Sequence, residues 1–209
     1  MSIEVASATP EEFASYVAGV WGQISVEEGE RLARLAGEAP EGLPFLELVS
    51  LHGRSLCYLA YGAAREQRFP NIYSVDVVRD ALGALASGLR RANIAGLNYP
   101  GRMVQIEISS QALAEVWQTP LALLHIDAEH SFTAACGDYN GFARWLAPGG
   151  WLAIHDYQDG FPGVQRCVDE IVLPERKWEE IALAGSLLTM RMPTDQEDQE
   201  HGQRCKILG

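Results

Sequence analysis

Polar, titratable side chains gather around the ends of two apolar runs in the second half of the sequence. The runs lie within LALLHIDAEHSF and LAPGGWLAIHDY, and the polar residues are His125, Asp127, Glu129 and His130 in the first and His155, Asp156 and Tyr157 in the second. Short apolar runs are typical of strands buried on both faces of a parallel sheet, and ligands bind at the carboxyl ends of such strands. Imidazole has an unperturbed pKa of about 6.5, so a histidine here could accept a proton near neutral pH.

The elements that must position these clusters alternate along the chain. Strands are expected over residues 43–50, 71–75 and 102–106, in the two apolar runs, and in a hairpin of 178–183 and 187–190, with helices between them. This alternation predicts an α/β fold of the Rossmann-like, doubly wound type, with a mostly parallel seven-stranded sheet and a C-terminal antiparallel hairpin.

Two helices precede the first strand. Thr9-Pro10 begins a helix that should run to about Trp21, and Ser25 with Glu28 forms a capping box for a second helix that should end near Gly37. These helices are expected either to cover the open edge of the site or to serve as scaffold. We therefore divide the chain into a helical cover (1–40), a core (41–193) and a polar tail (194–209) that has little to bury and is expected to be disordered.

Composition limits the partners. The 209 residues carry a net charge of -12 and only two lysines, which argues against nucleic acid and favours a small-molecule substrate. Four scattered cysteines without CxxC spacing are typical of thiols in a reducing compartment. No apolar run approaches the roughly 20 residues that cross a bilayer, so we expect a cytoplasmic protein without membrane contact.

A carboxylate at the end of the second expected strand is suited to a nucleoside. Asp76 could accept hydrogen bonds from both hydroxyls of a ribose, although a strand-end aspartate also serves as a turn or helix-cap residue. The turn before it, Val49 to Gly53, contains one glycine and does not match GxGxxG. It is a poor pyrophosphate cradle, which favours a nucleoside without phosphates.

The segments ELVSLHGRS, SVD, LLHIDAEHSF, LAPGG and HDY, in this order, resemble the class I S-adenosylmethionine-dependent methyltransferases. Within that class the chain is similar to small bacterial O-methyltransferases related to macrocin O-methyltransferase and to cephalosporin-hydroxylase-like proteins. The resemblance covers residues 24–192. It implies transfer of a methyl group from S-adenosylmethionine to a hydroxyl of a small molecule, such as a secondary metabolite or a sugar.

The resemblance also assigns the cofactor site. It implies that the methionine and ribose side is lined by Glu47, Ser50, Gly53 and Ser55, the ribose hydroxyls are bound by Asp76, the adenine is contacted by Ser110 and Gln111, and Asp127 adjoins the cofactor. The chain departs from the family at Val49, where glycine is usual. A Cβ there is expected to crowd the cofactor or to shift the backbone.

For the chemistry, the resemblance places His130 where catechol and caffeoyl-CoA relatives have a general-base lysine, although a helix-cap role for His130 stays open. The cation ligands of those relatives match Asp127, His155 and Asp156, a set that would suit manganese or iron(II) better than magnesium. In the metal-free alternative, His155 is the base or an orienting partner and is held by Asp156.

Two other functions remain open at this point. Asp127, His130, His155 and Asp156 could form a metal centre for a non-methylating reaction, or the chain could be a binding protein on the same fold. A homodimer is one way to complete the thin cover over the carboxyl edge of the sheet.

Overall fold

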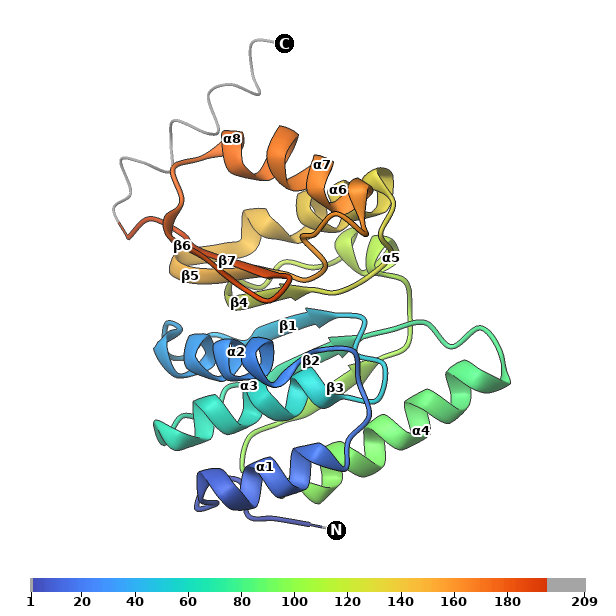
Figure 1. Ribbon diagram of the computed structural model, residues 1–209, viewed down its shortest axis with the longest axis vertical. Coiled ribbons are helices and arrows are strands. Elements are labelled where there is room, and N and C mark those ends of the chain that lie inside the picture. Colours follow the sequence, from blue (N-terminus) through green and yellow to red (C-terminus); the bar gives the residue numbers. More distant parts are fainter. Residues whose placement is uncertain (1, 195–209) are drawn as a thin grey trace.

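The computed structural model describes residues 2–194 and is built around one seven-stranded sheet (Figure 1). The strands are β1 Phe45–Leu48, β2 Ile72–Val75, β3 Met103–Ile106, β4 Leu121–Ile126, β5 Leu146–Ile154, β6 Glu179–Ala184 and β7 Leu187–Arg191. Their spatial order is β3-β2-β1-β4-β5-β7-β6, and β1 to β5 are parallel. The hairpin of β6 and β7 pairs antiparallel with β5, which confirms the predicted fold.

Helices pack on both faces of this sheet. They are α1 Pro10–Ala18, α2 Val26–Glu38, α3 Arg54–Arg65, α4 Ala81–Gly96, α5 Ser110–Ala114, α6 Phe132–Phe142, α7 Pro162–Cys167 and α8 Leu173–Glu175, with a 3-10 turn at Ala143–Trp145 and a π-helical turn at Val168–Val172. One core joins α1, α2 and α3 to the sheet through Phe13, Leu32 and Leu59. The other core joins α5, α6 and α7 to the opposite face of the sheet through residues such as Trp117 and Tyr139.

The N-terminal helices begin where the sequence predicts. Both have a complete capping box, in which the Thr9 or Ser25 hydroxyl accepts from the backbone of Glu12 or Glu28 and the carboxylate accepts in return. The first helix ends at Ala18 instead of Trp21, because Gly19 closes it. Among residues 2–194, no helix is both long enough and apolar enough to span a membrane. The predicted tail lies, apart from residue 194, outside the described residues.

The strand order has a switch point between β1 and β4, in the middle of the sheet. The connections from β1 and from β4 leave in opposite directions, since β2 and β3 lie on one side of β1 while β5 lies beyond β4. Open α/β sheets bind ligands at such a switch point, beyond the carboxyl ends of the strands. The residues that follow β1, β4 and β5 are therefore the place to look for a site.

Candidate active site

The two polar clusters predicted from the sequence lie together at this edge. β4 and β5 are in register from Leu123 with Trp151 to Ile126 with Ile154, so Asp127 and His155 leave neighbouring strands at the same level. The Nδ1 of His155 lies 3.1 Å from Oδ1 of Asp127. The Nε2 of His130 lies 2.8 Å from Oδ2 of Asp156, which closes the cluster.

Glu28 of α2 is a member of this cluster that the sequence reasoning missed. Its Oε1 accepts hydrogen bonds from the Ser186 backbone N–H at 2.8 Å and the Ser186 hydroxyl at 2.9 Å. Its Oε2 accepts from the Ser25 N–H at 2.7 Å and lies 3.4 Å from Nε2 of His155. Glu28 is only 4% exposed. Its sequence position marks it as a capping residue, and nothing in the spacing connects it with a histidine 127 positions later.

These carboxylates fix the charge of His155. Burial by itself disfavours the imidazolium, but the hydrogen bond to Asp127 and the close contacts with Asp156 and Glu28 outweigh it and raise the pKa of His155 to about 12. Burial likewise opposes ionisation of Glu28, yet its contacts with His155, Ser25 and Ser186 hold the pKa of Glu28 well below its usual value. The three carboxylates around the ring therefore favour the charged form of His155.

His130 differs from His155 in its access to solvent. Its side chain is 40% exposed, and its ring lies 4.2 Å, centroid to centroid, from that of Phe161. Because Nε2 already contacts Asp156, that carboxylate is placed to stabilise a proton on the ring. Of the two histidines predicted as catalytic, His130 has the geometry of a proton acceptor and His155 that of a fixed charge.

The loop after β1, which the sequence predicts to bind the cofactor, takes left-handed backbone conformations although it has only one glycine. Val49 and Leu51 adopt left-handed backbone conformations with φ of 63° and 45°, and Gly53 follows with φ of 86°. For an L-residue such a conformation costs roughly 1–2 kcal/mol, and for a β-branched valine it is rare. Val49, where the sequence departs from the family, therefore has a strained backbone.

Glu47 lies behind this loop. Its side chain is fully buried, and its Oε1 lies 2.8 Å from Nδ1 of His125. The Ser50 hydroxyl donates to Glu47, and the Ser74 hydroxyl donates to Ser50 at 2.8 Å. His125 is therefore a buried, hydrogen-bonded residue of β4. Through the hydrogen bond from Ser50, Glu47 helps to fix the conformation of the loop after β1.

A hollow of about 180 Å³ lies between this loop and the connection from α1 to α2. Its lining includes Trp21, Gln23 and Ile24 from the connection, Val49, Ser50, Leu51 and Ser55 from the loop region, and Asp127 and His130. The predicted covering role of the N-terminal helices is thus carried by the segment that joins them. Apolar walls, a serine pair, the Asp127 carboxylate and the Arg54 guanidinium suit a small ligand that has both apolar and polar groups.

The other predicted cofactor residues already have protein partners. Oδ2 of Asp76 accepts from Nη1 of Arg90 at 2.6 Å. The Ser110 hydroxyl donates to Asp138 at 2.5 Å, and Nε2 of Gln111 lies 3.5 Å from the same oxygen. Burial raises the pKa of Asp138. None of these residues lines the hollow, so the hollow contains only part of the predicted cofactor site.

One group of side chains has the arrangement of a cation site. Within residues 2–194, Asp127, His130 and Asp156 place one ligand atom each within 4.8 Å of the others. His155, the nitrogen ligand predicted from the sequence, is instead turned between Asp127 and Glu28. A carboxylate pair with one imidazole matches the ligand preferences of manganese and iron(II).

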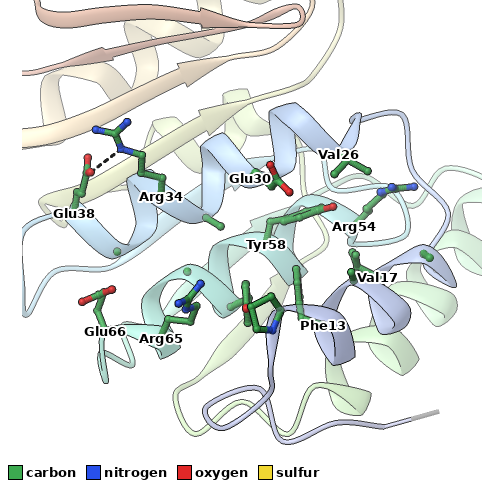
Figure 2. Close-up of a pocket in the computed structure, with 17 residues that line it drawn as sticks. Phe13, Val17, Val26, Glu30, Arg34, Glu38, Arg54, Tyr58, Arg65 and Glu66 are labelled. Atoms are coloured by element: carbon green, nitrogen blue, oxygen red, sulfur yellow. Dashed lines mark hydrogen bonds and ion pairs between the residues drawn. The ribbon is translucent and has the colours of Figure 1, made fainter.

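Another cavity lies away from this edge, between α1, α2 and α3 (Figure 2). It encloses about 680 Å³ and is lined by apolar residues such as Phe13, Val17 and Tyr58, with Glu30 and Arg34 among its charged groups. Arg54 lines both this cavity and the hollow at the strand ends. The cavity includes none of the residues predicted for the site.

Solved structures of O-methyltransferases share the fold of this chain. An O-methyltransferase from Bacillus cereus in complex with SAH is 15% identical and has a TM-score of 0.62, with 91% of each chain covered. TomG, an O-methyltransferase from Streptomyces achromogenes in complex with SAM, is 12% identical with a TM-score of 0.63 over 93% of this chain and 92% of that one. CalS11, a TDP-rhamnose 3'-O-methyltransferase of calicheamicin biosynthesis, is 17% identical with a TM-score of 0.58 over 88% and 95%.

A family model described as a methyltransferase domain matches residues 46–157, which is more than half of the chain. The chain therefore belongs to this family of methyltransferase domains, as the resemblance implied. The matched segment runs from β1 to the residue after Asp156 and so contains the loop after β1, Asp76 and most of the charged cluster.

Proposed function

We propose that this protein transfers the methyl group of S-adenosylmethionine to a hydroxyl oxygen of a small molecule. Family membership supports the reaction class, and the solved relatives with SAH or SAM support the cofactor. The TDP-rhamnose specificity of CalS11 supports a sugar or another metabolite as acceptor. The observation that carries the proposal is the half-exposed His130 at the rim of the hollow, with Asp156 behind its ring.

The mechanism needs few groups from the protein. Bound S-adenosylmethionine supplies an electrophilic methyl group on a sulfonium, and transfer to oxygen is an in-line displacement. Asp127, at the hollow and next to Asp156, favours a positive charge there. His130 accepts the hydroxyl proton as the oxygen attacks, and Asp156 stabilises the resulting imidazolium. The exposed side of the ring then releases the proton to solvent.

A second form of the proposal uses a divalent cation. Asp127, His130 and Asp156 would bind it, and the cation would lower the pKa of a coordinated acceptor hydroxyl. His130 cannot be metal ligand and free base at once, so the two forms exclude each other. The earlier ligand set of Asp127, His155 and Asp156 stays a prediction. The His155 ring already contacts the carboxylates of Glu28, Asp127 and Asp156, which favours His130 as the nitrogen ligand.

The test combines binding and turnover. S-adenosylhomocysteine is titrated into the protein by calorimetry, and product formation is followed with a panel of sugar and phenolic hydroxyl acceptors. We expect binding by the parent, and H130Q should bind as the parent does but lose methyl transfer by about a hundredfold or more. E129Q is the matched control, since the Glu129 carboxylate accepts from Ser131 instead of joining the cluster.

The alternatives give different results. Activity that survives EDTA selects His130 as base, whereas activity that EDTA removes and manganese restores selects the cation. A protein that binds no S-adenosylhomocysteine at millimolar concentration and retains a stoichiometric transition metal would instead be the non-methylating enzyme of the earlier alternative. A homodimer and a cytoplasmic location belong to the same proposal, and light scattering on the purified protein tests the dimer.

A further inference from the structure

Helix α4 places its polar and apolar residues in an unusual way. Arg90 is 1% exposed, while Leu82, Leu85 and Leu89 on the same helix are exposed. An amphipathic helix normally turns its leucines inward and its arginines to solvent. Burying a guanidinium is costly unless it is paired. A specific contact must therefore stabilise the inward position of Arg90.

Arg90 contacts residues that are predicted to bind the cofactor or adjoin those that do. Its Nη1 donates to Oδ2 of Asp76 at 2.6 Å and to the backbone carbonyl of Leu51 at 2.9 Å. Its side chain also packs against the turn, because a Cβ on Gly53 would lie 3.3 Å from Cγ of Arg90. One side chain thus connects the strand-end acid after β2 with the loop after β1.

A second contact from the same helix lies one turn further on. Nδ2 of Asn93 donates to the carbonyl of His52 at 2.9 Å. The Asn93 carbonyl in turn accepts from the hydroxyl of Tyr16 in α1. Two successive carbonyls of the loop, those of Leu51 and His52, are therefore held by α4.

The loop held in this way is the strained one. Val49 and Leu51 have positive φ, and residues in such conformations persist only when their surroundings over-determine them. A glycine in place of Val49 would adopt this conformation without steric cost. Where the family has that glycine, this chain has a valine and a buried arginine that binds the carbonyl two residues later.

We propose that Arg90 is a positioning residue for the cofactor, which clamps the strained Val49 to Gly53 loop and Asp76 in the conformation that binds S-adenosylmethionine. Asn93 completes the clamp. The inference rests on the proposed function for the identity of the ligand. The clamp itself is a property of the loop and can be measured without any ligand.

The binding experiment compares R90M, R90K and R91M. R90M keeps the aliphatic stem and removes both hydrogen bonds, and we expect S-adenosylhomocysteine affinity to fall by about ten- to a hundredfold, as for lost hydrogen bonds to charged groups. R90K should recover most of this loss. KM for S-adenosylmethionine should rise while kcat at saturation changes little. R91M is the control, since Arg91 is exposed and pairs with Glu107.

The V49G background tests whether strain is the reason for the clamp. If it is, R90M should cost at least threefold less affinity in V49G than in the parent, because the glycine loop no longer needs to be held. Equal losses in the two backgrounds would overturn this explanation. So would an R90M affinity equal to that of R91M.

Amide hydrogen exchange of the ligand-free protein separates the clamp from the cofactor assignment. R90M should accelerate exchange across residues 49–53, and V49G should reduce that acceleration. If the parent binds no S-adenosylhomocysteine but this pattern is found, the proposed function fails and the clamp stands. If R90M does not fold, N93A takes its place with an expected loss of about three- to tenfold for one neutral hydrogen bond, and parent-like exchange and binding by N93A would overturn the clamp.

Discussion

Replacing Glu28 by glutamine is the sharpest test of how the charged cluster is built. Both carboxylate oxygens of Glu28 face hydrogen-bond donors. Oε1 faces the N–H and hydroxyl of Ser186, and Oε2 faces the Ser25 N–H and the His155 ring. Glutamine has the same shape but replaces one oxygen with an NH2 group. Whichever way its amide turns, a donor then faces a donor.

The size of the effect follows from what is left unpaired. A buried donor without an acceptor costs about 1–3 kcal/mol. An uncompensated charge on a buried partner costs about 3–5 kcal/mol when one member of the pair is removed. His155 keeps Asp127 and Asp156, so its charge is only partly exposed to this penalty. We therefore expect E28Q to lower the free energy of unfolding by about 3 kcal/mol, a large part of the 5–15 kcal/mol typical of a domain.

The assay is urea unfolding at pH 7, followed by circular dichroism and extrapolated linearly to water. E27Q is the matched control because Glu27 is exposed in the same first turn of α2, and its loss should stay within about 1 kcal/mol. An E28Q protein no less stable than E27Q would show that Glu28 does not anchor the cluster. A change in the urea dependence itself would point to the denatured state instead.

Three further results are expected. Folding raises the pKa of His155 from 6.5 to about 12, so its contribution to stability is complete below pH 6.5 and is lost as the pH rises toward 12. Between pH 7 and 8.5 the free energy of unfolding should therefore fall by up to about 1.4 kcal/mol per pH unit. The variant H155N should abolish this pH dependence. Gly62→Ala should lower the free energy of unfolding by more than about 3 kcal/mol, since its Cβ would overlap the Ala33 carbonyl where α3 crosses α2. Gly88→Ala, at an open helical position, should instead raise the free energy of unfolding by about 0.5–1 kcal/mol, as measured by thermal unfolding. Gly53→Ala should lose more than 1 kcal/mol, as judged by urea midpoints, because φ is 86° and Arg90 leaves little room.

The fold could be predicted from the sequence because its signals are local. Apolar runs with polar ends mark β1, β2 and β4, and capping boxes mark the starts of α1 and α2. Helix ends were less certain. α4 runs from Ala81 to Gly96, because Asp80 is its cap and Gly88 does not end it. α6 ends at Phe142, and a 3-10 turn separates it from the start of β5 at Leu146.

The site was predicted only where strand ends define it. Asp127, His155 and Asp156 follow β4 and β5, so parallel pairing alone brings them together. Glu28 and Arg90 could not be found in this way, because each lies on a helix whose inward direction is decided by tertiary packing. Arg90 is followed by Arg91, and the sequence does not show which of the two is buried and which faces solvent.

The N-terminal segment links both halves of the proposed site to the rest of the molecule. Glu28 of α2 contacts His155 in the charged cluster and Ser186 in the turn of the hairpin. The Tyr16 hydroxyl of α1 donates to the Asn93 carbonyl, and the Asn93 side chain donates to the His52 carbonyl in the loop after β1. The connection between the two helices covers the hollow itself. Each contact crosses from the helical cover into the core through a buried polar group, and such groups are costly to leave unpaired. The cover and the core should therefore unfold together, and a ligand that orders either half of the site should stabilise both.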